Sequence, residues 1–238
     1  LWFFDKGKPE ALRDKVLFID AQRYHTAVST TLNEWTPWQL KNLSAIVWLY
    51  RGEAGKYHDL IEAYKDRATE VAPLFGGDAA EKLLGIGGAE DFAIAHEAML
   101  VAIENQKATS KEEVDALPKR EQKKRREALA EVTARMESAA TEIGEAVWLV
   151  EKFGDGEYVD VPGLCKVATR AEIKGDQPVE KSSWSLTPGA YVGVPPVEDD
   201  GLDFHERMTE MHAELLELQR HSNNLMAIID RNFQELGL

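Results

Sequence analysis

The sequence predicts a mainly α-helical fold with a long helical hairpin, a long C-terminal helix and a short β-hairpin near the N-terminus. Three observations support this prediction. Apolar residues recur every three or four positions over most of the chain, as they do on the buried face of a helix. Two threonines open capping boxes, which mark helix starts. Short runs of β-branched and aromatic residues near the N-terminus and within residues 154–196 indicate the few strands.

The composition indicates a globular protein. Of the 238 residues, 44% are apolar, and the longest apolar runs are too short to cross a membrane. The single cysteine, Cys165, excludes an internal disulfide framework and a multi-thiolate metal site, and it suggests a reducing, cytoplasmic setting. The net charge of −14 argues against an extended DNA-binding groove, because such a groove needs clustered Lys and Arg.

The first twenty residues predict two strands. Residues 1–4 and 16–19 are short apolar runs, and the turn-forming residues 5–9 lie between them. Both runs are continuous rather than alternating, which suits strands buried on both faces of a sheet. Because two strands alone are not stable in water, we expect further strands upstream of a chain that opens in mid-strand.

Helices are expected through the middle of the chain. A capping box at Thr36, followed by Pro37 and Gln39, predicts a helix start. Apolar residues of the two longest expected helices form helical stripes, so these helices should pair as an antiparallel hairpin closed by residues 108–118. The predicted helices span residues 37–51, 57–71, 89–107 and 119–153.

Residues 154–196 change character, with many Gly and Pro residues and few helical periods. Thr169 opens a second capping box and predicts a short helix, and residues 191–194 are expected to form a strand. An acidic run at 198–200 then precedes a last helix at about 202–236. The expected segments are therefore 1–35, 36–156, 157–200 and 201–238.

The last helix carries the most regular pattern in the chain. Its seam residues alternate spacings of four and three over more than four heptads, and a helix of about 35 residues spans roughly 50 Å. This length favours a partner helix on another subunit, although packing against its own chain is the alternative. The seam comprises Phe204, Met208, Met211, Leu215, Leu218, Ser222, Leu225, Ile229, Asn232 and Leu236, of which the apolar residues up to Ile229 are the expected subunit interface.

The start of the 119–153 helix holds a concentrated basic patch. A patch of this kind can contact DNA phosphates, whereas the alternative is an ordinary solvated helix face. Cations at a helix start are disfavoured by the macrodipole, so an acidic group is expected nearby. The basic patch comprises Lys119, Arg120, Lys123, Lys124, Arg125 and Arg126.

Other chemistry-bearing residues form no recognisable site. The glycines of residues 85–88 lack a phosphate-binding spacing, which favours a loop or a helix cap. The histidines show no zinc-binding spacing, and no nucleophile–base arrangement can be argued. We therefore predict no catalytic, cofactor-binding or metal-binding residue in this chain. The histidines are His25, His58, His96, His205, His212 and His221.

Three stretches together resemble the methyltransferase (M) subunits of type I DNA restriction-modification systems. They are residues 16–22 (VLFIDAQ), 158–173 and 186–193 (LTPGAYVG), and the likeness covers roughly 1–51 and 157–236. Ala190 departs from the usual Arg, and residues 52–156 match no signature and are expected to be an insertion. The family-signature residues are Asp20, Gly163, Lys166, Thr187, Pro188, Gly189, Tyr191 and Gly193.

The resemblance implies a parent protein that transfers a methyl group from S-adenosylmethionine to adenine N6. The family's methyl-donor loop and its Asn-Pro-Pro motif are missing here, so this chain alone is expected to be inactive. The early strands would then belong to an upstream α/β methyltransferase sheet. The implied partners are the specificity (S) subunit through the last helix, the restriction (R) subunit, and DNA through the full complex. The alternatives are a free-standing helical interaction module and a small enzyme built from the scattered His and acidic residues.

Overall fold

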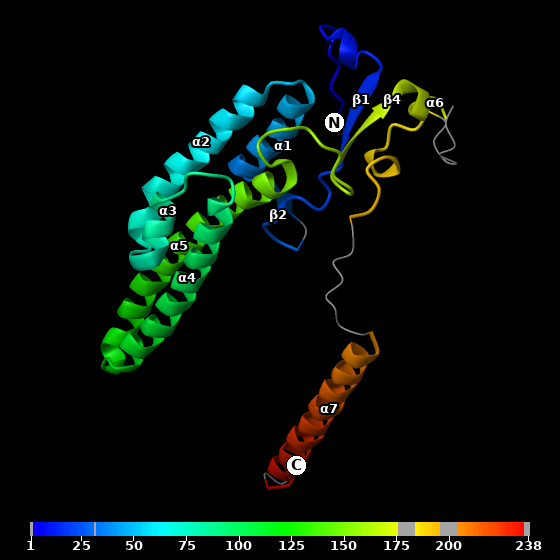
Figure 1. The fold of residues 1–238 in the computed structure, drawn as a ribbon. Helices are drawn as coiled ribbons and strands as arrows, with labels where there is room; N and C mark the ends of the chain where they lie inside the picture. The colour runs from blue at the N-terminus through cyan, green and yellow to red at the C-terminus, as the bar shows by residue number, and fades with distance from the viewer. Residues whose placement is uncertain (1, 31, 176–183, 196–203, 236–238) are drawn as a thin grey trace. The chain divides into compact units, whose positions relative to one another are not determined.

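The computed structural model describes residues 2–30, 32–175, 184–195 and 204–235. The chain divides into two compact units, residues 1–195 and 196–238 (Figure 1). The predicted mainly α-helical fold is confirmed. The first unit contains the expected segments 1–35 and 36–156 and residues 157–195 of the third expected segment. The helices are α1 (Pro37–Tyr50), α2 (Ala54–Val71), α3 (Gly77–Leu84), α4 (Asp91–Asp115), α5 (Lys119–Phe153), α6 (Arg170–Lys174) and α7 (Phe204–Glu235).

Both predicted capping boxes are present. At the start of α1, the Thr36 hydroxyl accepts the backbone N–H of Gln39 at 3.1 Å, and the Gln39 side chain accepts the N–H of Thr36 at 3.0 Å. Thr169 and Glu172 make the same reciprocal pair at the start of α6. These bonds satisfy backbone donors that a helix start otherwise leaves unpaired, so the local sequence determines where both helices begin.

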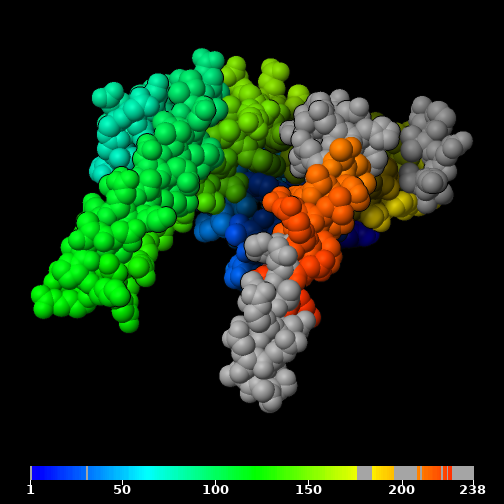
Figure 2. Space-filling view, turned by 90° about the horizontal axis from the view of Figure 1, so that it is seen from below, coloured from blue at the N-terminus to red at the C-terminus, as the bar shows by residue number. Residues whose placement is uncertain are grey.

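The predicted helical hairpin is formed by α4 and α5, which run side by side (Figures 1 and 2). Helix α5 begins and ends at the predicted residues, whereas α4 continues to Asp115 instead of ending at residue 107. Its added turns contain good helix formers and place Val114, which is buried, at the end of the hairpin. The expected connection of 108–118 therefore shrinks to 116–118.

Helix α3 was not expected from the sequence. It begins at Gly77, directly after Gly76, which adopts a φ of +67°. Ala79 and Leu83, four residues apart, are buried and hold this helix against its neighbours.

One apolar core joins α1, α2, α4 and α5. Side chains from all four helices are buried in it, many of them within the expected insertion. Leu17 and Ile19, which precede the expected boundary at 36, are partly buried and pack against the same core. Helix α5 also contacts α1 and α2 directly. Burial of this size supplies the main stabilising term for such a unit. The largest fully buried apolar side chains are Tyr57, Tyr64, Phe92, Ile46, Leu83, Met99, Ile143 and Leu149.

The predicted strand at residues 16–19 is confirmed as β1 (Lys15–Ile19), but its predicted partner is wrong. Strand β1 pairs antiparallel with β4 (Cys165–Thr169), placing Phe18 opposite Lys166. Residues 2–4 form no strand, and their side chains are exposed. Their β-rich composition was misleading because a strand also needs a hydrogen-bonded partner, and in the described sheets β1 pairs with β4 and not with residues 2–4. A second small pair joins β2 (Thr26–Ala27) to β3 (Asn33–Glu34).

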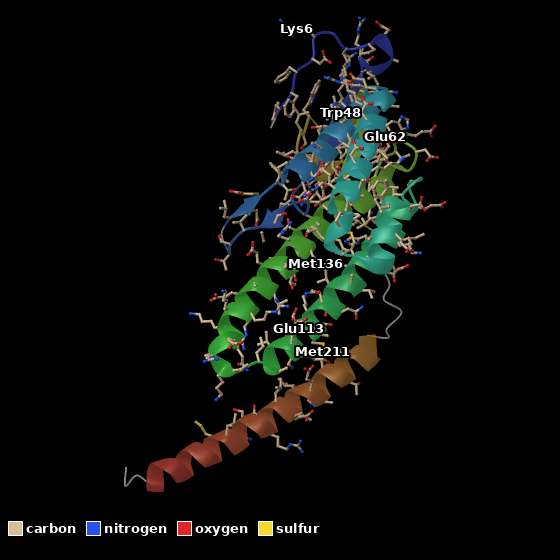
Figure 3. All side chains as sticks on the ribbon, turned by 90° about the vertical axis from the view of Figure 1, so that its left-hand side faces the viewer. Lys6, Trp48, Glu62, Glu113, Met136 and Met211 are labelled. Carbon is tan, nitrogen blue, oxygen red and sulfur yellow. The ribbon has the colours of Figure 1, made fainter. Side chains whose placement is uncertain are left out.

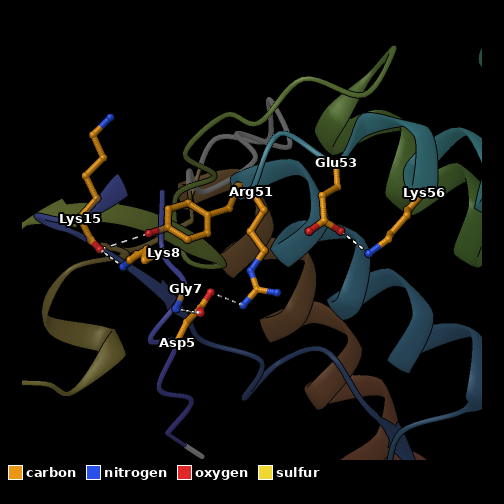
Figure 4. Close-up of polar contacts among 8 residues, drawn as sticks. Asp5, Gly7, Lys8, Lys15, Arg51, Glu53 and Lys56 are labelled. Carbon is orange, nitrogen blue, oxygen red and sulfur yellow. Dashed lines mark hydrogen bonds and ion pairs between the residues drawn. The ribbon is translucent and has the colours of Figure 1, made fainter. Parts of the chain in front are cut away.

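Polar contacts hold the N-terminal segment against the end of α1 (Figure 4). The Arg51 guanidinium lies 3.0 Å from the Asp5 carboxylate, and the Tyr50 hydroxyl donates to the Lys15 carbonyl at 3.1 Å. The Lys8 ammonium donates to the same carbonyl. The short 3₁₀ helix η1 (Glu10–Leu12) lies between these contacts.

The predicted strand at residues 191–194 is also wrong. The 3₁₀ helix η3 (Pro188–Ala190) leads into two buried residues, Tyr191 and Val192. Gly193 then adopts a φ of +71°, a conformation that an extended strand does not use. A further 3₁₀ helix, η2, spans Ala72–Leu74. Among the described residues, no helix combines the length and apolarity that a membrane crossing needs.

Candidate functional site

The eight family-signature residues gather around the β1–β4 sheet, and we call this group the signature cluster. They come from three segments that are far apart in the sequence: the end of β1, the turn and strand at β4, and the chain around η3. Backbone bonds join the segments, since Leu164 accepts the N–H of Asp20 at 2.7 Å and Val192 accepts the N–H of Gly163 at 2.7 Å. The residues that carry the resemblance therefore form one structural neighbourhood.

A small apolar core lies beneath the signature cluster. The Tyr191 ring stacks on the Phe18 ring, with centroids 4.1 Å apart and planes 11° apart. The Tyr191 hydroxyl donates to the carbonyl of Ser185 at 2.5 Å. Ala168 and Ile173 complete this core. The stacked pair thus connects β1 to the η3 segment directly.

Two glycines of the signature cluster allow close approach of the chain. At Gly163, φ is +77°, and a Cβ atom would lie 2.3 Å from the Cγ of Pro195. At Gly189, a Cβ atom would lie 3.5 Å from Oδ2 of Asp20, whose other carboxylate oxygen accepts the N–H of Gln22 at 3.0 Å. Gly163 is therefore required for steric and conformational reasons, whereas Gly189 leaves ordinary contact space.

The charged member of the signature cluster has a nearby partner. The Lys166 ammonium lies 3.6 Å from the Glu172 carboxylate. The pKa of Glu172 is lowered, mainly by the backbone N–H of Thr169 and further by the Thr169 hydroxyl and by Lys166. Lys166 thus faces the carboxylate that caps α6. These contacts position chain segments and include no nucleophile paired with a base.

A buried polar network that the sequence analysis missed joins α1, α2 and α5 to the chain after β1. Gln39 donates to the Glu145 carboxylate at 2.9 Å, and the Tyr24 hydroxyl donates to the same carboxylate. The Asn42 amide donates to the Glu145 carbonyl and to the Tyr24 oxygen, both at 2.9 Å, while the Tyr64 hydroxyl donates to Asn42 at 2.9 Å. The only indication of this network in the sequence is that polar residues interrupt the apolar faces of the helices.

Both tyrosines of this network remain protonated donors. Burial raises the pKa of Tyr24, and the neighbouring Glu145 raises it further. Burial and Glu145 also raise the pKa of Tyr64. A ring stack of Tyr24 on Trp148, with centroids 3.9 Å apart, holds the first phenol in place. Since every polar group has a partner, the network specifies how the helices align.

The basic patch lies on the first two turns of α5, and its six side chains are exposed. The acidic neighbour expected from the helix dipole is Glu113 of α4, whose carboxylate lies 2.6 Å from the Arg125 guanidinium (Glu113 is labelled in Figure 3). Arg120 pairs with Glu121 at 3.2 Å. Across the described part of the chain, no ion pair engages the remaining four cations.

The seam of the last helix lies on α7, which starts at Phe204 and ends at Glu235. At about 1.5 Å per residue, its 32 residues span roughly 48 Å. The side chains of Phe204 and Ile229, and all of Leu236, lie outside the described residues. The described apolar seam residues are 48–62% exposed, and they are Met208, Met211, Leu215, Leu218 and Leu225.

The glycines of residues 85–88 end one helix and begin another, as the sequence indicated. Gly85 follows α3, and the N–H groups of Gly87 and Gly88 donate to the Asp91 carboxylate at 2.9 and 2.7 Å. These bonds lower the pKa of Asp91, that of Gly88 contributing most. Within the described ranges, no three His, Cys, Asp or Glu side chains gather as a metal site would require.

Comparison with known proteins finds two curated proteins that match part of the chain. The HindI type I restriction enzyme methylase subunit of Haemophilus influenzae is 42% identical over 80 residues, which are 34% of this chain and 17% of that protein. The MjaIX type I restriction enzyme methylase subunit of Methanocaldococcus jannaschii is 36% identical over 89 residues, or 37% of this chain and 15% of that protein. The chain is related to type I restriction enzyme methylase subunits.

This relationship confirms the resemblance seen in the sequence. The chain spans only a small part of the length of the two methylase subunits that it matches. No family model and no solved structure matches it. The roles of the signature cluster, the basic patch and the seam of α7 are not assigned by the methylase relationship and stay predictions.

Proposed function

We propose that this chain is part of the methylase subunit of a type I restriction enzyme and that α7 attaches that subunit to its specificity subunit. Two independent observations support this proposal. The chain is similar in sequence to methylase subunits of such enzymes. Its last helix carries a heptad seam whose described apolar members are exposed.

The seam of α7 is the observation that carries the proposal. Leu215 and Leu218 occupy successive a and d positions, where a coiled-coil partner buries such side chains. Burying a leucine completely is worth about 1.5–3 kcal/mol, so several seam residues together can supply a specific interface. Ser222 interrupts the apolar seam at one a position, and a polar residue there favours one register over others.

The first unit has a different part in this proposal. The signature cluster and the buried polar network hold segments that are distant in the sequence in one arrangement, which suits a rigid support for a catalytic domain. Methyl transfer from S-adenosylmethionine to adenine N6 would take place on other residues of the whole subunit. In this arrangement the chain contributes to assembly and to the enclosure of DNA.

A free-standing helical interaction module is the alternative function. The exposed seam of α7 fits this alternative equally well, because a heptad does not identify its partner. The two functions differ in the partner: the alternative requires no specificity subunit. A small complete enzyme would instead require catalysis by the isolated chain.

Co-elution with the specificity subunit on size exclusion tests the proposal. The 238-residue chain and the specificity subunit of the same system should elute together, ahead of either protein alone. Separate elution at micromolar concentrations would refute the proposed attachment. In a parallel assay, the isolated chain should transfer no label from S-adenosylmethionine to adenine-containing DNA, and measurable transfer would favour the small enzyme.

A further inference from the structure

The end of the α4–α5 hairpin concentrates positive charge in an otherwise acidic chain. We call residues 107–126 the hairpin tip. It contains eight Lys and Arg residues against four Asp and Glu residues, which gives a local charge of +4, while the whole chain carries −14. The tip lies at the far end of the hairpin from the β1–β4 sheet (Figure 1). The chain as a whole therefore repels a polyanion, but the hairpin tip attracts one.

Contacts between α4 and α5 hold the hairpin tip together. Val114 of α4 and Leu129 of α5 are buried, and the Gln122 amide donates to the Leu117 carbonyl at 2.9 Å across the short connection. The ion pair between Arg125 and Glu113 adds a link between the two helices. The cations are thus presented on a preorganised helical surface, which lowers the entropic cost of binding a ligand.

The cations are spaced suitably for a row of phosphates. Lys119, Lys123 and Arg126 are four and three residues apart, so they follow one face of α5 over roughly 10 Å. Each strand of duplex DNA carries one phosphate per about 3.4 Å of helix axis, so the row of cations is long enough to meet more than one phosphate. The neighbouring groove between the helices is less uniformly basic, because Asp115 and Glu137 line it beside Lys107, Lys111 and Arg126.

Folding gives no reason for so many cations at this position. Positive charge near a helix start opposes the helix dipole. Among the described residues, only Arg120 and Arg125 of the basic patch have carboxylate partners. We propose that the hairpin tip binds the phosphate backbone of duplex DNA through the basic patch. This inference rests on the proposed function only for the choice of duplex DNA as the polyanion.

Protection of lysines from acetylation by duplex DNA tests this inference on the unaltered 238-residue chain. At low ionic strength, a short duplex should slow the acetylation of Lys119, Lys123 and Lys124 and leave that of Lys6 and Lys82 unchanged. Equal effects on both groups would overturn the inference. Equal protection of the tip by polyglutamate would also overturn it, because the surface would then suit an acidic protein.

A matched pair of variants gives the second readout. Replacing Lys123, Lys124, Arg125 and Arg126 with Gln should make the log–log salt dependence of duplex binding shallower by about 3 to 4. An unchanged slope would refute the contact. The control variant replaces four exposed cations elsewhere with Gln: Lys6, Arg13, Lys82 and Lys174. It removes the same total charge and should leave the slope unchanged.

Neither assay includes the specificity subunit. If α7 does not bind the specificity subunit, the proposed function is refuted, but the acetylation and salt-dependence results are unaffected. Absence of DNA protection at the tip would refute only the present inference.

Discussion

The ring of Tyr191 stacks on the ring of Phe18 at a centroid distance of 4.1 Å, although 173 residues separate them in the sequence. This contact brings the η3 segment onto the β1–β4 sheet and forms the centre of the small core beneath the signature cluster. Because the cluster contributes few other buried side chains, its arrangement depends strongly on this pair.

Replacement of Tyr191 measures that dependence. Tyr191→Ala should lower the free energy of unfolding by about 3–5 kcal/mol, as for other large buried aromatic residues. Tyr191→Phe keeps the ring and loses only the hydrogen bond to Ser185, so its effect should be about 1 kcal/mol. Urea titration followed by fluorescence compares the two variants. Equal losses would show that the hydroxyl, not the stacked ring, stabilises the cluster.

Gly163→Ala should destabilise the first unit by about 1–3 kcal/mol, because an added Cβ meets Pro195 and must adopt a positive φ. Gly193→Ala provides a matched control: φ is also positive there, but no atom lies within 4 Å of the added Cβ. The difference between their thermal unfolding midpoints isolates the steric contact. If both variants unfold at the same temperature, the approach of Pro195 is not restrictive.

Asn42→Leu should cost about 3 kcal/mol, because it removes a donor from the buried Glu145 carboxylate and the acceptor of the Tyr64 hydroxyl. Adding Tyr64→Phe removes the unpaired hydroxyl and should recover part of this loss. A double-mutant cycle from denaturant titrations measures the coupling. Strict additivity of the two changes would contradict a direct hydrogen bond between these residues.

His96 should make the protein less stable as the pH is lowered below neutral. Burial lowers the pKa of His96 below its usual value, while a backbone bond to Ala140 opposes this shift. The folded state therefore disfavours the charged ring, so the unfolded state binds more protons and stability is lost as pH falls through the unfolded pKa of about 6.5. His96→Gln should reduce the loss of unfolding free energy between pH 7.5 and 5. An unchanged slope would assign the pH dependence to other groups.

The sequence predicted most accurately the features that depend on local signals. The capping boxes at Thr36 and Thr169 each span only four residues, and both mark a helix start in the structure as predicted. The apolar stripe of α5 predicted both ends of the helix. Such features need no information about distant segments, since they follow from hydrogen bonds and periodicity within one helix.

Features that depend on distant contacts were missed. The partner of β1 lies about 150 residues away, and a short apolar strand carries no signal that selects between a neighbour and a distant edge. The network around Glu145 was missed for the same reason, because its bonds to Gln39 and Tyr24 span more than 100 residues. Of the candidate site, the sequence indicated the signature residues but not how they come together.

The affinity of the chain for the specificity subunit tests the central proposal most directly. Leu215→Asp combined with Leu218→Asp places charges on the seam of α7 and should raise the Kd by roughly a hundredfold or more. Ala213→Asp combined with Leu216→Asp has the same spacing and added charge, but lies off the seam at exposed positions, and should leave the Kd nearly unchanged. Equal affinities of the two variants, or unfolding of the first unit by the seam variant, would contradict attachment through this helix.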